Sequence, residues 1–309
     1  MVAKDKIHVS MGSYKHQPVV LKGPECPMLR IQRAMRAEIL SMQLATSPYV
    51  LPLLAVLDST KDLRAPLAVA GTRPLFCPTL LVEHMEDGDL AAYHDALRYA
   101  NHDTATEPAI VPPLAIAWVV ANALLDLHAK NVLHRDIKSR NIFLSKRHFV
   151  RLGDLGSART LGAFMTSSVG TICWIAPEVF RVPGETAEDC VYTSAADIYS
   201  FGVVLTELFT HTEPYSELVD RRNVETLVRT GQLRPRISEA CPLWLRTLTE
   251  KCLAFDPTAR PTAAEIVDEL YAHRDEAGMS LMTATTETTP MIMPTMTEMP
   301  TTTEMSTES

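Results

Sequence analysis

Short apolar runs separated by polar residues mark the beginning of the chain. The β-branched run Val19–Leu21, which ends in Lys22, predicts a strand. Over residues 30–44 apolar side chains recur near helical spacing, which predicts a helix that follows the strand. The apolar positions of this helix are Ile31, Met35, Ile39 and Met42.

Two more strands are indicated before residue 85, at residues 49–57 and 79–83. The segment between them, residues 58–78, contains Pro66, Gly71 and Pro74 and is predicted to be a loop, because these residues interrupt regular structure. The N-terminal part of the chain is therefore expected to form a small, β-rich lobe.

From Leu114 onward the pattern becomes helical. Residues 114–129 form one strongly apolar stretch, long enough for a helix and too short to span a bilayer. Further helices are predicted at residues 196–210, 222–231, 242–253 and 262–272. A small β-rich lobe followed by a larger helical lobe indicates an α+β fold.

The composition changes sharply after residue 274. Residues 280–309 contain eleven Thr, six Met and four Glu but no aromatic or basic residue, so they have few groups that can form a packed core. We expect residues 275–309 to be a disordered tail. The segment is interpreted as a low-complexity end, with a docking or phosphorylation segment as the alternative.

Charge and cysteine content exclude several classes of function. The net charge is −8, with six acidic and no basic residues in 275–309, so a basic surface for nucleic acid is not expected. The six cysteines have neither CxxC pairs nor zinc spacing, which favours reduced thiols. Since the N-terminus lacks the apolar core of a signal peptide and no apolar run is long enough for a membrane span, a cytoplasmic protein is expected.

Two motifs in the second half of the chain carry candidate chemistry. The octet His134–Asn141 (HRDIKSRN) is followed thirteen residues later by the motif that begins at Asp154 (DLG). Phosphoryl transfer requires an oriented hydroxyl, metal ions on the phosphates and neutralised charge. Asp136 can accept a hydrogen bond from a substrate hydroxyl, and Asn141 and Asp154 offer the hard oxygen ligands that Mg²⁺ prefers. A lone triplet of this kind is usually a charged turn, but both motifs together favour a catalytic site.

With these motifs in place, residues 13–273 resemble a eukaryotic-type protein kinase domain. The resemblance implies a bilobal fold within residues 1–274, with the lobes meeting near residue 84. It also implies catalytic roles for Asp136, Lys138 and Asn141, and binding of ATP phosphates by Lys22 with Glu38 as its ion-pair partner.

The segment Leu80–Asp89 resembles the hinge between the two lobes of this family. The resemblance implies that the backbone of Glu83 and Met85 binds adenine, with Asp89 near the ribose. Val82 would close the rear of the pocket, and Val20 and Phe143 would pack on the two faces of the adenine ring. An ordinary edge strand that runs into a turn is the alternative for the hinge segment.

Four further positions match residues of the family. Thr171, in the segment Gly170–Glu178, would hydrogen-bond with Asp136 and Lys138. Glu178 and Arg260 match a buried ion pair. Asp197 resembles the aspartate that hydrogen-bonds the backbone of the octet His134–Asn141, called the catalytic segment below. An exposed helix cap is the alternative.

The glycine-rich loop expected before Lys22 is degenerate. If Gly12 is its third glycine, Ile7 and Val9 occupy the first two positions and Tyr14 lies over adenine, which would limit how closely the backbone approaches phosphates. An eroded lobe, weak nucleotide binding and a missing strand are the interpretations left open. Leu155, in place of the usual Phe after the metal-binding Asp, is a smaller departure.

The resemblance is strongest to the tyrosine-kinase-like group of serine/threonine kinases. It implies an enzyme that uses ATP and Mg²⁺ to phosphorylate Ser or Thr of a protein substrate, since Lys138 favours these hydroxyls. A pseudokinase that acts as a scaffold is the alternative. An upstream kinase acting on Ser167 or Ser168 is a further expected partner, because Arg135 can bind a phosphate on that loop.

Overall fold

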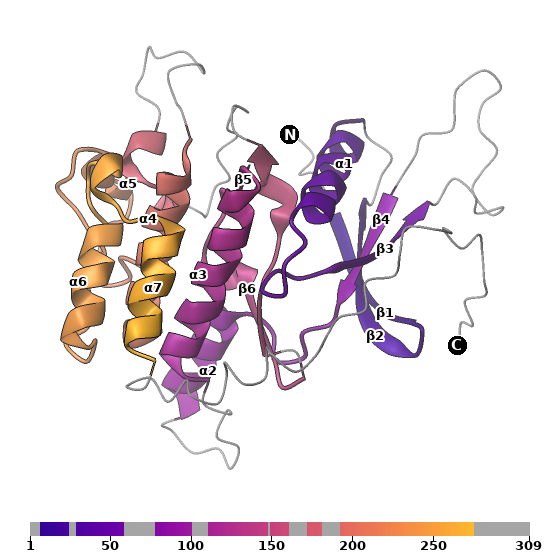
Figure 1. Ribbon diagram of the computed structural model, residues 1–309, viewed down its shortest axis with the longest axis horizontal. Helices are drawn as coiled ribbons and strands as arrows, with labels where there is room; N and C mark the ends of the chain where they lie inside the picture. Colours follow the sequence, from indigo (N-terminus) through magenta and orange to yellow (C-terminus); the bar gives the residue numbers. More distant parts are fainter. Residues whose placement is uncertain are drawn as a thin grey trace.

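The computed structural model describes residues 7–24, 29–58, 78–100, 111–147, 149–160, 172–180 and 192–274. An antiparallel sheet and one helix lie at one end of the molecule, and most of the helices lie at the other (Figure 1). This is the expected α+β arrangement of a small lobe and a larger helical lobe.

Four antiparallel strands form the N-terminal sheet in the order β1-β2-β4-β3. They are β1 (Ile7–Tyr14), β2 (Gln17–Pro24), β3 (Leu53–Asp58) and β4 (Pro78–Glu83). Lys15 and His16 form the two-residue turn between β1 and β2 with φ of 50° and 62°, as the twist of a tight hairpin favours. Val9 pairs with Lys22 in this register, so the first half of β1 runs beside the lysine.

Helix α1 (Leu29–Leu44) packs against this sheet. Its predicted periodicity is confirmed, because Ile31, Met35, Ile39 and Met42 are all buried. Glu38 is also buried, at 4% exposure. A carboxylate on the packed side of a helix is costly unless it is paired, so its partner is the first place to look for a site.

The larger lobe is built around two buried helices, α3 (Pro113–Ala129) and α4 (Ser194–Thr210). Every residue of α4 from Ala196 to Leu208 is buried, which identifies it as a helix covered by protein on all sides. The other helices pack around them (Figure 1). These are α2 (Leu90–Ala100), α5 (Val224–Arg229), α6 (Leu243–Cys252) and α7 (Ala263–Ala272).

Short elements occupy the region between the sheet and the helices. Two small antiparallel sheets of two strands each pair β5 (Val132–Leu133) with β8 (Arg159–Thr160) and β6 (Ile142–Ser145) with β7 (Phe149–Leu152). Single turns of 3₁₀ helix follow or precede them: η2 (Ser139–Asn141), η3 (Leu155–Ser157), η4 (Ile172–Trp174), η5 (Pro177–Val179) and η6 (Pro257–Ala259). One hydrophobic core continues through both lobes.

The predicted elements differ from the observed ones at several places. The strand predicted at residues 49–57 begins only at Leu53, because Tyr49 to Pro52 turn toward β7, where Val50 bridges Leu152. Strand β1, helix α2 and the short strands β5 to β8 are absent from the predicted elements. The loop at residues 58–78 and the tail after residue 274 lie almost entirely outside the described residues. Among the described helices none is both long and apolar enough to cross a membrane.

Candidate active site

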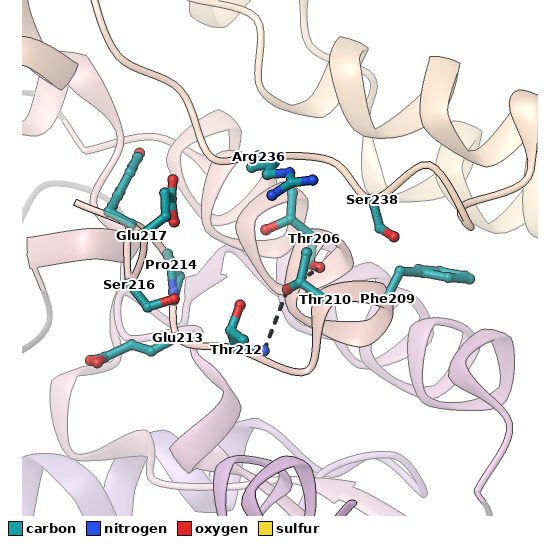
Figure 2. A pocket seen from close by; sticks show the side chains of 11 residues that line it. Thr206, Phe209, Thr210, Thr212, Glu213, Pro214, Ser216, Glu217, Arg236 and Ser238 are labelled. Atoms are coloured by element: carbon teal, nitrogen blue, oxygen red, sulfur yellow. Dashed lines mark hydrogen bonds between the residues drawn. The ribbon is translucent and has the colours of Figure 1, made fainter. Parts of the chain in front are cut away.

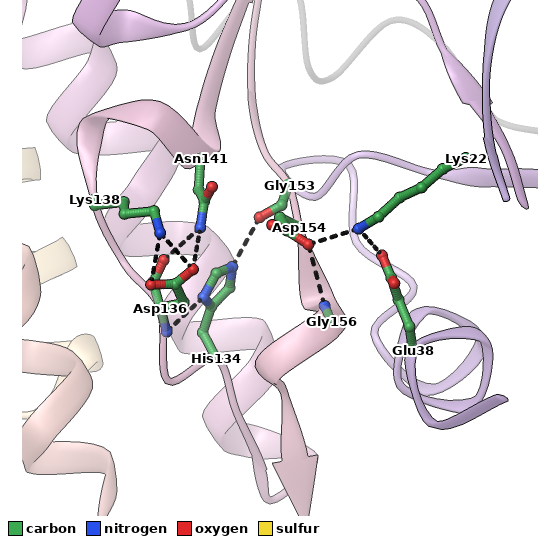
Figure 3. A network of polar contacts seen from close by, with 9 residues as sticks. All are labelled: Lys22, Glu38, His134, Asp136, Lys138, Asn141, Gly153, Asp154 and Gly156. Atoms are coloured by element: carbon green, nitrogen blue, oxygen red, sulfur yellow. Dashed lines mark hydrogen bonds and ion pairs between the residues drawn. The ribbon is translucent and has the colours of Figure 1, made fainter. Parts of the chain in front are cut away.

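The segment between β5 and η2 holds the Asp136 carboxylate in one orientation (Figure 3). Lys138 Nζ donates to both of its oxygens, at 2.9 and 2.7 Å. Asn141 Nδ2 donates to Oδ2 at 3.0 Å. The carboxylate is therefore oriented before any substrate arrives, which is the arrangement required of a group that must align an acceptor hydroxyl.

The Asn141 amide is oriented by the same contacts. Its nitrogen also donates to the Asp136 carbonyl at 2.7 Å, and its oxygen is directed away from Asp136 (Figure 3). The backbone of Asn141 accepts a hydrogen bond from Gly153 N at 2.8 Å, so the residue is tied to the segment that carries Asp154.

Three elements converge on the ammonium group of Lys22. The lysine lies on β2 and contacts Glu38 Oε1 of α1 at 2.7 Å and Asp154 Oδ1, at the end of β7, at 2.8 Å (Figure 3). Asp154 adopts a left-handed backbone conformation, with φ 57° and ψ 68°. Such a conformation is uncommon for a residue with a side chain and needs support from its surroundings; here Asp154 Oδ1 also accepts from Gly156 N at 3.4 Å.

The charges of this ion-pair cluster reinforce each other. Burial alone would raise the pKa of Asp154, but the charge and hydrogen bond of Lys22 lower it below its ordinary value. Burial alone would lower the pKa of Lys22, but Asp154 and Glu38 raise it above its ordinary value. Both groups are thus charged at neutral pH.

Asp197 on α4 holds the backbone of the catalytic segment. Its carboxylate is fully buried and accepts from His134 N at 2.9 Å and Arg135 N at 2.8 Å. Tyr192 donates to it at 2.7 Å, and His128 Nε2 lies 2.9 Å away. Burial would raise the pKa of Asp197, but His128 lowers it below its ordinary value. The predicted backbone contact is confirmed, and an exposed helix cap is excluded.

Gly153, directly before Asp154, connects the same network through its backbone. Its carbonyl lies 3.0 Å from His134 Nε2, and its nitrogen donates to Asn141. A Cβ atom at this position would lie 2.7 Å from the Phe143 ring. Only glycine therefore fits between β7 and the ring without a displacement.

Glu178 and Arg260 form the expected ion pair. Two guanidinium nitrogens contact the two carboxylate oxygens at 2.7 and 2.8 Å. The Arg260 side chain is fully buried and also donates to the carbonyl groups of Ala195 and Ala254. The pair joins η5, which carries Glu178, to η6 and α4. Its role is therefore to hold these elements together.

The residues expected around adenine lie on the sheet and the following hairpin. Val20 and Val82 are paired across β2 and β4. Phe143, on β6, is half-buried and packs against the hydrophobic core. Val82 is itself 9% exposed and belongs to that core. Their contact with a nucleotide stays a prediction.

The hinge segment is attached to the helical lobe by its backbone and by Glu86. This carboxylate accepts from Ser145 Oγ at 2.7 Å and Lys146 N at 2.9 Å, and the Ser145 hydrogen bond is the main cause that lowers the pKa of Glu86 to about 2. Glu83 ends β4, and Met85 is buried.

Asp89, expected near a ribose, forms a helix cap in the structure. Its Oδ1 accepts from Ala92 N at 2.9 Å. An Asp that precedes a helix commonly accepts from the backbone of the first turn. A ribose contact would use the same side chain, so that role stays a prediction.

The proposed alignment of the glycine-rich loop is wrong. Ile7, Val9 and Gly12 all lie in β1, and Gly12 pairs with Val19 in the middle of the strand. Tyr14 is at the hairpin turn, opposite Gln17. The part of β1 that lies beside Lys22 carries Val9, so neither Gly12 nor Tyr14 is placed to cover phosphates bound there.

Several expected positions lie outside the described residues. These are Thr166, Ser167, Ser168, Gly170 and Thr171. The contact of Thr171 with Asp136 and the role of a phosphorylated loop therefore stay predictions.

The structure also identifies contributors that the sequence analysis misses. His128 and Tyr192 complete the contacts of Asp197. Glu207 accepts from both Ser139 and Trp174. Glu207 had a visible signal, since an acid among the apolar residues of a helix is seldom buried without partners. His128 had none, because Asp197 lies 69 positions away. Tyr192 is only five positions from Asp197 but lies outside every predicted helix or strand.

The oxygen donors at the junction of the lobes fit Mg²⁺. Asn141 directs an amide oxygen away from Asp136, and Asp154 supplies an ionised carboxylate held by Lys22. Mg²⁺ commonly takes one or two such ligands and completes its shell with water and phosphate oxygens. In the part of the chain that the structure describes, His, Cys, Asp and Glu form no cluster of three or more that could hold a metal, so protein ligands alone would not complete the shell.

Comparisons with known proteins agree with this geometry. The sequence profile of the family "Protein kinase domain" matches residues 25–272. The serine/threonine-protein kinase STY17 of Arabidopsis thaliana is 37% identical over 167 residues, which cover 53% of this chain and 28% of the relative. The serine/threonine-protein kinase A-Raf of Sus scrofa is 35% identical over 204 residues, covering 63% of this chain and 32% of the relative.

The matches cover only part of the relatives and only part of this chain. The chain spans about a third or less of the length of these relatives. The family match begins at residue 25, so β1 and Lys22 lie outside it, and Lys22 is assigned to the site by its contacts with Glu38 and Asp154.

Proposed function

Because the chain belongs to the protein kinase domain family, we propose that it is an active kinase that transfers the γ-phosphoryl group of ATP to Ser or Thr hydroxyls of a protein. The main support for this proposal is the cluster of Lys22, Glu38 and Asp154. Lys22 Nζ on β2 lies 2.7 Å from Glu38 Oε1 on α1 and 2.8 Å from Asp154 Oδ1, just after β7. This cluster places a cation and a metal-binding carboxylate side by side, which supports phosphoryl transfer over a scaffold role.

Each polar group of the site has a role in this proposal. Asp136 accepts the hydrogen bond of the acceptor hydroxyl and aligns it, while Lys138, beside it at 2.7 Å, neutralises charge on the phosphoryl group. Lys22 binds the α- and β-phosphates and is held in place by Glu38. Asn141 and Asp154 hold Mg²⁺, which when bound would neutralise phosphate charge.

The acceptor specificity rests on Lys138 and on the relatives. Its ammonium group contacts both oxygens of Asp136, and this lysine favours Ser and Thr over Tyr in the family that the chain resembles. STY17 and A-Raf are both named serine/threonine-protein kinases. Adenine binding by the backbone of Glu83 and Met85, between Val20 and Phe143, belongs to the same proposal.

A scaffold without phosphoryl transfer is the second candidate, and β1 favours it. The strand position beside Lys22 carries Val9, and Ile7, Val9 and Met11 are 40%, 61% and 58% exposed. If no backbone loop covers the phosphates, ATP binds more weakly than it does to relatives with a complete loop.

Transfer of label from γ-labelled ATP to a generic basic protein separates these candidates. We expect Mg²⁺-dependent incorporation into Ser and Thr by the wild-type chain and by Asp220→Asn, which changes an exposed acid of the same type. We expect none from Asp136→Asn. Equal incorporation by Asp136→Asn and wild type would reject the role of Asp136, and calorimetry that detects no ATP binding would favour the scaffold.

Regulation by phosphorylation of Ser167 or Ser168 is part of the proposal. A phosphate near the catalytic segment would be drawn to Arg135 by bidentate, charge-assisted hydrogen bonds. Mass spectrometry of active protein, combined with activity measurements on the double variant Ser167→Ala/Ser168→Ala, tests this. Full activity of the double variant with Thr166 unmodified would contradict it.

A further inference from the structure

Strand β1 carries the most regular row of exposed apolar side chains in the described part of the chain. Ile7, Val9 and Met11, called the apolar row below, alternate along the strand at 40%, 61% and 58% exposure. A cavity of about 390 Å³ in the helical lobe is instead lined mainly by polar side chains, among them Glu213 and Arg236 (Figure 2). Single exposed apolar residues are common on protein surfaces, whereas a row of them on one strand indicates a contact surface.

Strand β1 is also an open edge of the N-terminal sheet. It is first in the order β1-β2-β4-β3, so among the described strands only β2 pairs with it. Tyr14 and Gln17 flank the two-residue turn. Such a flanking pair is hydrogen-bonded, and in an antiparallel pair of strands the hydrogen-bonded pairs recur at every second residue. Counted back from Tyr14, the backbone groups of Met11, Val9 and Ile7 therefore face away from β2.

The opposite edge of the sheet is protected against further pairing, and β1 is not. Strand β3 is shorter, has an irregular register between Leu53 and Ala55, and ends at Asp58. Irregularities and charges of this kind keep an edge strand from pairing with other chains. Strand β1 has eight residues in unbroken register with β2 and contains no Pro, Asp, Glu, Lys or Arg. It therefore retains the features of a strand that accepts a further strand.

The apolar row is symmetric about Val9, which favours a second copy of the same chain as the partner. In an antiparallel pair with a two-fold axis through Val9, the two Val9 residues lie opposite each other and Ile7 lies opposite Met11. Each exposed side chain of the apolar row then has an apolar neighbour about 5 Å away across the strands. On the other face His8 lies opposite Ser10, so no like charges meet within residues 7–11.

We propose that β1 pairs antiparallel with β1 of a second copy and that the two N-terminal sheets form one continuous sheet in a two-fold dimer. The inference does not depend on phosphoryl transfer. Val9 pairs with Lys22 across β1 and β2, so the added strand borders the face of the sheet that carries Lys22. The contact is small, so we expect association in the micromolar range and not a permanent dimer.

Sedimentation of the full chain from about 1 to about 200 µM tests the association. We expect the average mass of wild type to rise toward that of a dimer, and that of Val9→Lys to stay at the monomer, because a charge on an edge strand prevents pairing. Leu243→Lys is the matched control, since it adds the same charge at an apolar residue of α6 that is 78% exposed, and should behave as wild type. A wild-type chain that stays monomeric, or a dimer that persists in Val9→Lys, would overturn the proposal.

Cysteine substitutions test the register. Val9→Cys places two Cα atoms about 5.5 Å apart across the two-fold axis, within the range that a disulfide spans, so oxidation with diamide should link the two copies. Ser13→Cys lies on the same strand, but the two equivalent positions are more than about 25 Å apart. It should give no more linked product than wild type, whose six cysteines set the background. Linkage through Ser13→Cys and not through Val9→Cys would contradict this register.

Amide hydrogen exchange, resolved by residue, distinguishes a second copy from another segment of the same chain. The amides of Val9 and Met11 face the open edge, so they should exchange more slowly at about 200 µM than at about 5 µM. The amides of Ser10 and Gly12 face β2 and should not change with concentration. Slow exchange of Val9 and Met11 at both concentrations would assign the edge to a segment of the same chain and reject the dimer.

Discussion

The helical half of the candidate site and its sheet half are held in different ways. On the helical side Asp197 and Glu207 are buried on one helix. Asp197 accepts from the backbone of His134 and Arg135, and Glu207 accepts from Ser139 and Trp174. On the sheet side β1 is exposed along much of its length, and Lys22 is held mainly by its two ion pairs. The proposed acceptor side is therefore preorganised, whereas the proposed nucleotide side depends on a few charges.

The largest effect is expected where the two halves meet. Asp154→Asn and Lys22→Met remove the charge pair that joins β2 to the end of β7, and each should lower the rate of phosphoryl transfer by at least about a hundredfold. Neither residue is part of the apolar core, so the melting temperature should change by only a few degrees in Asp154→Asn; it should fall further in Lys22→Met, which removes the ion pair of the buried Glu38. Initial rates and thermal unfolding of the two variants measure this, and wild-type turnover in Asp154→Asn would refute the metal assignment.

Buried and exposed ion pairs of the helical lobe provide the next contrast. Glu178→Gln leaves the fully buried Arg260 guanidinium without its charged partner, and we expect a loss of about 2–4 kcal/mol in the free energy of unfolding. Glu213→Gln breaks the pair with Arg221, in which both side chains are well exposed, and should cost less than about 1 kcal/mol. Urea unfolding measures both, and equal losses would show that burial does not decide the difference.

Acid should destabilise the helical lobe through His94. Burial, followed by the nearby His211, lowers the pKa of His94 to about 3, whereas the unfolded chain binds this proton at about pH 6.5. Since the unfolded state binds more protons between these values, stability falls as the pH drops from about 6.5 toward 3, by about 2–4 kcal/mol in all. Urea unfolding at pH 7.5 and 5 should show a smaller loss in His94→Leu than in wild type; an identical loss would exclude His94 as a cause.

The smallest effects are expected from two glycines, one in each half. Gly153→Ala places a Cβ 2.7 Å from the Phe143 ring, and should cost about 1–3 kcal/mol of stability. Gly12→Ala meets the end of the Leu21 side chain at 2.5 Å, which can move because Leu21 is only partly buried, so less than about 1 kcal/mol is expected.

The ATP affinity of Gly12→Ala tests whether Gly12 contributes to nucleotide binding. Calorimetry should find it unchanged in Gly12→Ala, because Gly12 pairs with Val19 and not with Lys22. A large loss of ATP affinity in this variant would restore the role of Gly12 in a phosphate-covering loop.

Local patterns were sufficient for the features that depend on neighbours in the chain. The helix at residues 30–44 followed from apolar spacing, because a helix buries residues three and four positions apart. The helix at residues 114–129 followed from one long apolar run. The catalytic octet could be identified for the same reason, since Asp136, Lys138 and Asn141 contact each other across at most five positions.

Contacts between residues far apart in the sequence were decided by the packing of the elements against each other. Lys22 and Asp154 meet across 132 positions, and only the packing of the sheet against the helical lobe brings them within 2.8 Å. Periodicity could not assign Gly12 either, because a glycine fits a loop and a strand equally well until the partner strand is known. Glu207 was visible as an acid among apolar residues, but its two partners lie 33 and 68 positions away. A sequence pattern reports the geometry of one element, whereas a site arises from the surfaces that several elements bury against each other.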